Sequence, residues 1–322
     1  MKKRLLILCF SVAALAAATG QRVQWNAFRL TEENDFFNLT QRGIDRYYTQ
    51  GMRYEFMYRV SKKRVLEKIM LPLKGASINQ YSTSISQLIY TPANTSNLNF
   101  IGDMPYAGTL FLSQRLESAD TLNQLRLTSR LDAGLIGPAA LAKGAQDVFH
   151  NIIHNDIAVG WDTQLPNDIL LNYSARIEKN LISPKDWIRL ELRGEANLGT
   201  LLVNAVAGFN LEAGNWYSNR NFRWQIFFRP EVRGVIYNAL LQGGALNRGR
   251  AEEDPDHSKY YHRKVEPFVY SHATGFRVQY KKFGLFYRQV NLSSEFTRQP
   301  KHYYGTLMFT FLLGKYQQPA KF

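Results

Sequence analysis

Residues 122–135, LNQLRLTSRLDAGL, alternate between apolar and polar side chains. Leu125 and Leu127 fall at odd positions, whereas Arg126 and Arg130 fall at even ones. A period of two places successive side chains on opposite faces of a β-strand. The stretch therefore predicts a strand with one apolar face and one charged face.

The same alternation recurs along the chain, most clearly in residues 169–178, 187–196 and 303–313. We expect twelve strands, at residues 23–35, 46–60, 77–91, 107–117, 121–136, 168–180, 187–198, 201–212, 222–237, 262–280, 283–295 and 302–314. A soluble β-sandwich also alternates, but here charges of both signs occupy one face over many consecutive positions. An apolar surface toward lipid and an ion-paired lumen explain both features, and closure leaves no unpaired edge. The pattern therefore predicts an all-β fold, a twelve-stranded antiparallel transmembrane β-barrel.

Two sets of residues follow from this architecture. The residues expected to face lipid are Leu125, Leu127, Leu190, Leu192, Phe309 and Phe311. The aromatic residues expected near the membrane–water interfaces are Trp25, Tyr47, Tyr48, Trp187, Trp216 and Tyr303. An even number of strands returns the C-terminus to the periplasmic side, where the first strand begins.

Residues 1–20, MKKRLLILCFSVAALAAATG, have the features of a secretory signal peptide, with a basic start, a short apolar run and small residues at the end. We expect cleavage near Ala18 or Gly20, which leaves residues 21–322 as one outer-membrane barrel. Cys9, the single cysteine, lies within the cleaved segment. The mature chain is therefore expected to contain no disulfide and no cysteine metal site.

The chain is basic. Its formal charge is +14, and +11 remains when Lys2, Lys3 and Arg4 leave with the signal segment. A basic surface favours an anionic partner. Export, together with the absence of long basic runs, argues against nucleic acid. We therefore expect the partner to be an anionic lipid surface in the bacterial outer membrane.

The period changes in residues 137–165, GPAALAKGAQDVFHNIIHNDIAVGWDTQL. Apolar residues recur there at helical spacing, at Leu141, Ala145, Val148, Ile152 and Ile153. This spacing predicts a short helix in a loop on the extracellular side of the barrel. Gln146 and His150 lie four residues apart and would share one face of that helix.

The distinctive polar motifs fall at one end of the barrel if the first strand runs toward the cell exterior. They are Glu33–Asp35, Tyr48–Gly51, Tyr90–Pro92, Asp103–Gly108 and the helix that carries His150. Binding and catalytic residues concentrate on loops that a rigid scaffold holds in place. This end of the barrel is therefore the candidate site.

The residue types at this end suit hydrolysis by water. The chain has no Gly-x-Ser-x-Gly motif, so His150 could deprotonate water while a hard cation on Asn34 or Asp35 polarises an ester carbonyl. Thr49, with backbone N–H groups near Gly51, could stabilise the oxyanion. Structural roles stay open as well, because Thr49 is a strong β-former and His150 could pack against the strand beneath it.

Metal sites of two other kinds are weaker hypotheses. His150 and His154 have the i, i+4 spacing of a zinc site, but Asn151 stands where the HExxH motif has Glu. The acidic residues of 252–256 lack the spacing and the glycine of a calcium-binding EF-hand loop. Their pattern favours a solvated loop.

Taken together, the motifs resemble the lipid A 3′-O-deacylase (LpxR) family of outer-membrane enzymes. The segments that carry the resemblance are Asn34–Asp35, Asp45–Gly51, Asp103–Gly108, Ile136–Pro138, Gln146 with His150, and Trp161–Leu165. They cover the first half of the mature chain, and the second half matches by its strand pattern.

The resemblance implies a twelve-stranded barrel that hydrolyses the ester-linked 3′-acyloxyacyl group of lipid A with a divalent cation such as Ca²⁺. It implies that His150 is the general base, that Asp35 is the cation ligand, and that Asn34, Thr49 and Gln146 complete the site. The partner is then lipid A or lipopolysaccharide in the outer leaflet, and the active site faces the cell exterior. We expect the barrel to be a monomer.

The sequence departs from the family pattern in the loop between the third and fourth strands. The family has an active-site lysine there, whereas residues 92–103 contain none and Asn97 falls near the expected place. Met104 also stands where arginine is expected. These departures bear on the rate and on the position of the substrate.

Other functions remain as alternatives. One is a non-enzymatic outer-membrane barrel, a porin or surface-binding protein, although large charged side chains would mostly fill the lumen of a barrel of this size. Another is a phospholipase-type barrel that uses Ser, His and Asn. The candidate serines for it, Ser82, Ser84 and Ser86, lie deeper in the third strand than the helix of His150.

Overall fold

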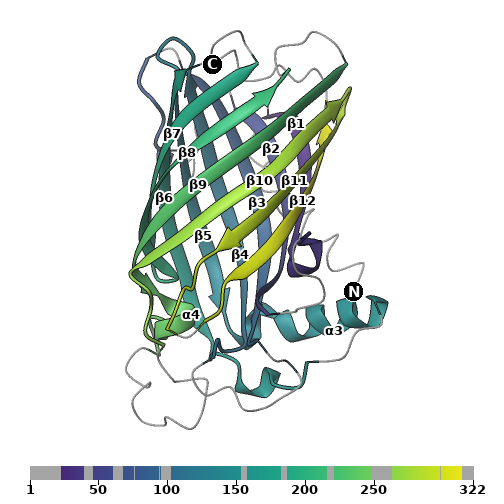
Figure 1. The fold of residues 1–322 in the computed structure, drawn as a ribbon, viewed down its shortest axis with the longest axis vertical. Helices are drawn as coiled ribbons and strands as arrows, with labels where there is room; N and C mark the ends of the chain where they lie inside the picture. The colour runs from purple at the N-terminus through teal and green to yellow at the C-terminus, as the bar shows by residue number, and fades with distance from the viewer. Residues whose placement is uncertain are drawn as a thin grey trace.

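The computed structural model describes residues 23–39, 46–60, 68–75, 77–93, 95, 103–153, 158–182, 187–215, 221–247, 263–297 and 299–313. Within these residues, twelve antiparallel strands close into a barrel in which sequence neighbours pair and β1 pairs with β12 (Figure 1). The strands are β1 (Val23–Asn34), β2 (Tyr47–Val60), β3 (Ile78–Thr91), β4 (Ala107–Asp120), β5 (Leu125–Ile136), β6 (Asp168–Ile182), β7 (Ile188–Gly199), β8 (Leu202–Gly214), β9 (Phe222–Asn238), β10 (Phe268–Tyr280), β11 (Phe283–Leu292) and β12 (His302–Leu312). The predicted twelve-stranded antiparallel β-barrel is confirmed.

The predicted strand bounds differ most from the observed ones at the starts of β5 and β10. Residues 121–124 form a turn, so β5 begins at Leu125. β10 begins at Phe268 rather than at residue 262. Proline has no N–H to give to a β-ladder, and Pro267 stands directly before the first paired residue of β10.

The outer surface of the barrel is apolar. The residues predicted to face lipid have the outward parity of their strands, at Leu125, Leu127, Leu190, Leu192, Phe309 and Phe311. Leu192 and Phe309 are exposed there, and Leu127 and Leu190 lie opposite the exposed Ile177 and Leu211. An apolar outer belt is what a membrane-spanning barrel requires.

No helix in the described part of the chain is both long enough and apolar enough to cross a membrane.

Charged side chains line the lumen and form ion pairs within a strand or between strands that lie one or two places apart. Arg126 Nε in β5 lies 3.0 Å from Glu178 Oε2 in β6, and Arg126 Nη2 lies 3.0 Å from Glu191 Oε1 in β7. Further ion pairs are Arg29–Glu55, Arg115–Glu117, Arg176–Glu195, Arg193–Glu231 and Arg288–Glu33. Pairing compensates charges that are removed from bulk water, so the lumen holds its many arginines and glutamates without an apolar core along its length.

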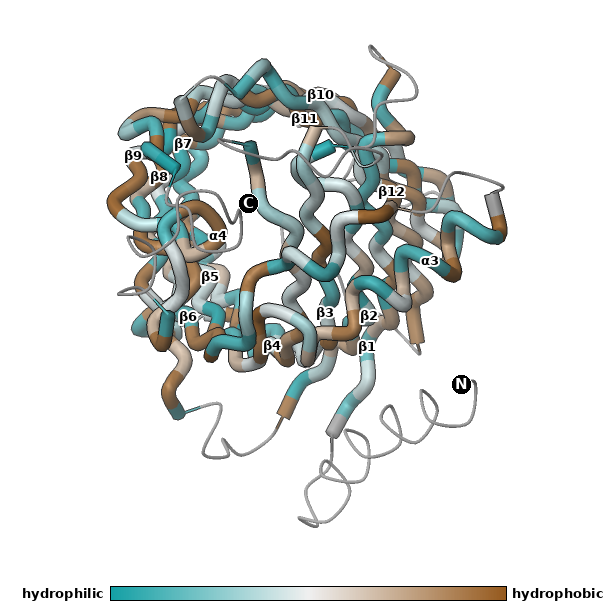
Figure 2. The backbone as a smooth tube through the Cα atoms, turned by 90° about the horizontal axis from the view of Figure 1, so that it is seen from below, coloured by the Kyte–Doolittle hydropathy of each residue, from teal (hydrophilic) through white to brown (hydrophobic). Residues whose placement is uncertain are grey.

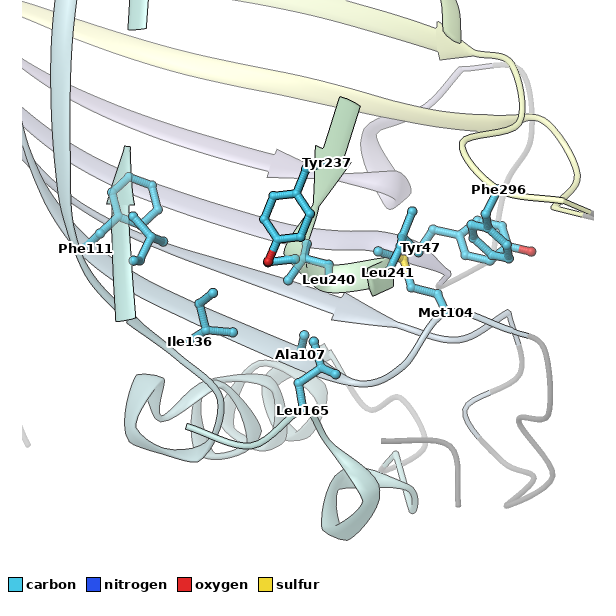
Figure 3. Packing of buried hydrophobic residues seen from close by; sticks show 12 residues of the cluster. Tyr47, Met104, Ala107, Phe111, Ile136, Leu165, Tyr237, Leu240, Leu241 and Phe296 are labelled. Atoms are coloured by element: carbon cyan, nitrogen blue, oxygen red, sulfur yellow. The ribbon is translucent and has the colours of Figure 1, made fainter. Parts of the chain in front are cut away.

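An apolar cluster lies inside the barrel at the end where β1 finishes (Figure 3). It includes Met104, Phe111, Ile136, Leu241 and Phe296, and we call it the mouth cluster. The short helix α4 (Ala239–Gln242), which follows β9, supplies three of its members. Side chains from strands, loops and α4 that are far apart in sequence thus pack together at this end of the lumen.

A segment of residues 68–75 lies on the outer face at the opposite end of the barrel, and we call it the strap. Its backbone forms hydrogen bonds with one outward-facing side chain on each of three strands, Ser118 in β4, Ser129 in β5 and Tyr173 in β6, at 2.9 Å each. Met70 of the strap is buried in an apolar cluster with Leu116. The strap therefore covers hydroxyl groups that would otherwise face the membrane.

The predicted aromatic girdle is wrong at two positions. Tyr48 points into the lumen, where its hydroxyl donates to Glu33 at 2.5 Å, and Tyr47 is buried in the mouth cluster. The cause is a β-bulge between Tyr48 and Gln50, because a bulge inserts an extra residue and breaks the alternation of faces. Trp25 instead meets outward-facing Phe56, and Trp187 is exposed.

Several predictions concern residues that the structure does not describe. These are the signal segment 1–20 with Cys9, Asp45, Asn97, His154, Trp216 and the acidic loop 252–256.

Candidate active site

The predicted helix forms and lies against the outside of the barrel wall rather than above its rim. α3 (Ala142–Ile153) follows a single turn, η2 (Pro138–Ala140). Gly108 in β4 faces outward, and a Cβ atom there would lie 2.3 Å from the Cβ of Ala142. Gln87 in β3 donates from its side chain to the carbonyl of Ala140 at 2.6 Å. A glycine in a strand permits close approach of another element, and here it lets α3 pack directly on the wall.

One face of α3 is buried and polar. Ala142, Gln146 and His150 lie four residues apart, and all three are buried. The indole N–H of Trp161, which begins the single turn η3 (Trp161–Thr163), donates to Gln146 Oε1 at 2.7 Å. Trp161 in turn packs on Tyr106, with ring centroids 5.0 Å apart. The buried indole fixes the Gln146 amide one turn before His150.

A second element lies on the outside of the wall beyond β1. η1 (Asp35–Phe37) directly follows β1, and the Asn34 side chain caps it by accepting the N–H of Phe36 at 2.7 Å. A Cβ atom at Gly305 in β12 would lie 2.5 Å from the carbonyl oxygen of Phe37. The Tyr287 hydroxyl of β11 donates to that same carbonyl at 2.9 Å. η1 is thus held on the outer face of β12 and β11.

Asp35 is the first residue of η1, and it is buried. Its Oδ2 accepts the backbone N–H of Arg46 at 2.8 Å, directly before β2 begins. The carboxylate is therefore fixed between the end of one strand and the start of the next.

The wall between η1 and α3 consists of β1 and β2. On its outer face, Glu32 Oε1 accepts the side-chain N–H of Gln50 at 2.9 Å. Glu32 Oε2 is buried and has no hydrogen-bond partner in the described part of the chain. Thr49 Oγ1 lies 2.7 Å from Thr91 Oγ1 on neighbouring β3. Polar groups thus occupy this part of the outer surface, whereas the belt that includes Leu192 and Phe309 is apolar.

The five predicted site residues all belong to this end of the barrel. Asn34 and Asp35 lie where β1 meets η1, Thr49 lies in β2, and Gln146 and His150 lie on the buried face of α3. Figure 2 shows α3 on the same side of the barrel as β12, β1 and β2. The two groups of residues therefore flank the same stretch of outer wall.

Glu32 was not among the predicted site residues. Gly108 and Trp161 lie in segments that carry the family resemblance, but the contacts that they make with Ala142 and Gln146 were not predicted. Glu32 has the parity of Phe28 and Leu30, whose partners Phe311 and Phe309 are exposed. A carboxylate at a lipid-facing position was the available signal, because such residues are rare and mark functional sites. For Gly108 the signal was a glycine inside a strand. Nothing in the local pattern identifies the contact of Trp161 with Gln146.

The competing sites receive little support. Ser82 donates to Glu55 at 2.6 Å, and Ser86 accepts from Arg53 at 3.0 Å. Both serines therefore face the lumen, on the opposite side of the wall from α3.

Over the described residues there is no group of three or more His, Cys, Asp or Glu side chains that could hold a metal ion by themselves.

The family model of the outer membrane protein LpxR matches residues 5–313. Among solved structures, LpxR from Salmonella typhimurium has 20% sequence identity and a TM-score of 0.70, over 89% of this chain and 100% of that one. This likeness shows a shared fold. The translocator domain of the autotransporter NalP from Neisseria meningitidis also matches, at 10% identity and a TM-score of 0.41 over 96% of each chain. No curated protein sequence matches this one.

Proposed function

The chain belongs to the family of the outer membrane protein LpxR, and from this premise we propose that it is a lipid A deacylase. It hydrolyses the ester that links the 3′-acyloxyacyl group to lipid A, as a monomer whose active site faces the cell exterior. Water activated by His150 is the nucleophile, and a divalent cation assists. Lipid A, or lipopolysaccharide, in the outer leaflet is the substrate.

The observation that carries this proposal is the buried polar face of α3 on the outside of the wall. Polar and ionisable groups at a membrane-facing surface are costly and are retained where they have a function. Gln146 and His150 are buried there, beside the strands that present Asn34, Asp35 and Thr49. A site in this position meets lipid from the side, without passage through the lumen.

The residues of the site have separate tasks in this mechanism. Histidine is the side chain whose ordinary pKa suits proton transfer from water near neutral pH, and His150 takes that proton. Gln146, fixed by the Trp161 indole, holds the helix face in place. The hydroxyl of Thr49 and nearby backbone N–H groups stabilise the negative charge that develops on the ester oxygen.

The residues present fit a hard cation. Such cations take oxygen ligands from carboxylates, amides and carbonyls. Asp35 supplies one carboxylate, Asn34 is adjacent to it, and Glu32 Oε2 is a buried carboxylate oxygen without a hydrogen-bond partner in the described residues. A cation bound by these oxygens would supply polarisation of the ester carbonyl. Asp35 and Glu32 would hold it.

The porin alternative is less well supported. Ion-paired side chains line the lumen, and the mouth cluster lies at one end of it. The phospholipase-type alternative would need a serine near His150, and the serines of β3 face the other side of the wall. Hydrolysis by activated water on the outer wall requires neither an open lumen nor a serine near His150.

The test is mass spectrometry of lipid A from cells that carry this protein and from cells that lack it. We expect a species lighter by the 3′-acyloxyacyl group to appear only when the protein is present. Cells that carry the His150→Ala protein at the same level in the outer membrane are the matched control and should lack that species. Identical lipid A in all three samples would refute the proposal.

A further inference from the structure

α3 has three different faces, because consecutive helical residues are rotated by about 100°. The first face, Ala142, Gln146 and His150, is buried against the wall. The other two faces are both exposed, and they differ in chemistry. His150, Asn151 and Ile152 show the rotation directly, since each belongs to a different face.

The second face is apolar. Leu141 lies directly before the helix, and Val148 and Ile152 form the second face within it. Their exposed fractions are 68%, 44% and 71%. Large apolar side chains gathered on one side of a helix normally face a protein core, a partner or a lipid phase.

The third face is polar. Lys143, Asp147 and Asn151 lie four residues apart, and Lys143 Nζ lies 2.8 Å from Asp147 Oδ2 in an exposed ion pair. This arrangement suits water or lipid head groups. A helix with one apolar and one polar exposed face is typical of segments that lie in the plane of a membrane interface.

The apolar face lies at the same end of the barrel as an exposed apolar part of the wall. Leu135 in β5 and Ile169 in β6 pair with each other on the outer surface, and both are exposed. Phe36 in η1 and Leu39 shortly after it are also exposed, at 70% and 71%. Apolar surface therefore continues from the barrel belt onto the elements that flank the candidate site.

We propose that α3 lies at the boundary between the acyl chains and the head groups of the outer leaflet. Its apolar face is inserted among the acyl chains of lipid A, and its polar face meets the head-group layer. The buried first face then presents His150 toward the wall at the depth where acyl chains join the head group. The choice of leaflet rests on the proposed function, whereas insertion among acyl chains does not.

This placement assigns the helix a role in recognition. The bilayer holds α3 by its apolar face, while the close contact at Gly108 holds the start of the helix on β4. A lipid whose ester lies at the same depth can then reach the site by lateral movement within the leaflet. Specificity for an acylated lipid, rather than a soluble ester, follows from the position of the helix.

The test uses the mature chain, residues 21–322, which contains no cysteine. Ile152→Cys and Asn151→Cys are each labelled with the environment-sensitive fluorophore NBD and reconstituted in phosphatidylcholine vesicles. Lipids that carry a doxyl quencher on the acyl chain should quench NBD at position 152 several-fold more strongly than at position 151. Aqueous iodide should show the reverse order. Val148→Cys and Asp147→Cys form a second matched pair with the same expected contrast.

Equal quenching by doxyl lipid at positions 151 and 152 would overturn the proposal. So would a label at position 152 that is shielded from iodide and yet not quenched by doxyl lipid, because a protein surface would then cover the apolar face. The vesicles contain no lipid A, so the result is independent of hydrolysis. Loss of the proposed activity with an intact quenching contrast would refute the function and leave the insertion standing.

Discussion

Two consecutive carboxylates in β1 point to opposite sides of the barrel wall. Glu33 faces the lumen, where it accepts hydrogen bonds from Arg288 at 2.7 Å, Tyr48 at 2.5 Å and Thr306 at 3.1 Å. Glu32 faces outward and accepts one from Gln50, while its Oε2 is buried without a hydrogen-bond partner among the described residues.

The difference separates the scaffold from the site. A buried carboxylate with several donors contributes to a fixed structure, whereas a buried oxygen without a donor costs free energy until something binds it. We therefore infer that side chains on the lumen side of the wall stabilise the fold, and that side chains on the outer side take part in the reaction. Changes on the outer side should alter activity, and changes on the lumen side should alter stability.

The largest effect is expected at His150, on the outer side. His150→Ala should lower the rate of lipid A deacylation by roughly 10² to 10⁴, the usual contribution of a general base. The heat-modifiable mobility that reports a folded barrel should not change, because His150 contributes nothing to strand pairing. Asn151→Ala, the next and exposed residue, is the control and should retain activity. Unchanged deacylation by a correctly inserted His150→Ala protein would contradict the role of His150 as the general base.

His154→Ala is a second comparison for the same residue. If His150 acts as a base by itself, the change at His154 should matter much less. Equal losses at both positions would instead support a two-histidine metal site.

Removal of divalent cations should have the next largest effect. Excess chelator should lower the rate by roughly 10²-fold or more, because a bound cation typically contributes several kcal/mol of transition-state stabilisation. Added Ca²⁺ should restore the rate, and barrel stability should change little, since the lumen is held by ion pairs between side chains. Full deacylation in excess chelator would exclude the cation from the mechanism.

A smaller loss is expected when α3 is moved away from the wall. Gly108→Ala places a Cβ atom 2.3 Å from that of Ala142, so the helix must shift. Displacement of a catalytic group by about 1 Å costs roughly tenfold to 100-fold in rate. Gly144→Ala is the matched control, because a Cβ atom there meets nothing within 4 Å. Equal rates for both variants would show that the contact at Gly108 does not position the site.

The smallest effects distinguish the two carboxylates themselves. Glu33→Gln should lower the free energy of unfolding by about 1 to 2 kcal/mol, because it weakens the charge-assisted bonds with Arg288. Glu32→Gln should change stability by less than about 0.5 kcal/mol in chelator. It should, however, reduce any stabilisation that Ca²⁺ gives. Urea titrations in detergent, with and without Ca²⁺, measure the free energy of unfolding of each variant and the stabilisation by Ca²⁺. If Glu32→Gln in chelator lost more free energy of unfolding than Glu33→Gln, the assignment of the two carboxylates would be contradicted.

The barrel itself could be predicted from the sequence because its dominant signal is local. Alternation in stretches such as residues 122–135 identifies each strand and the side of the wall that each residue faces. The prediction failed at Tyr47 and Tyr48, where the bulge before Gln50 breaks the alternation. A bulge depends on pairing with a neighbouring strand, and a single strand pattern does not contain that information.

The site was predicted in part. The helical period identified α3 and the shared face of Gln146 and His150, but the period alone does not say which face meets the wall. In a soluble protein the apolar residues of such a helix would be buried, and here Val148 and Ile152 are exposed instead. That inversion arises from the lipid environment and from the contact at Gly108.

The strap between β2 and β3 constrains the order in which the barrel assembles. Its hydrogen-bond partners belong to β4, β5 and β6, and all three strands follow the strap in the chain. Residues 68–75 therefore cannot reach their final position until those strands lie side by side. Before that moment the hydroxyl groups of Ser118 and Ser129 are uncovered. In a nascent barrel that enters the bilayer, docking of the strap is a late event, and it replaces a polar band of the wall with the exposed side chains of Ile69 and Leu71.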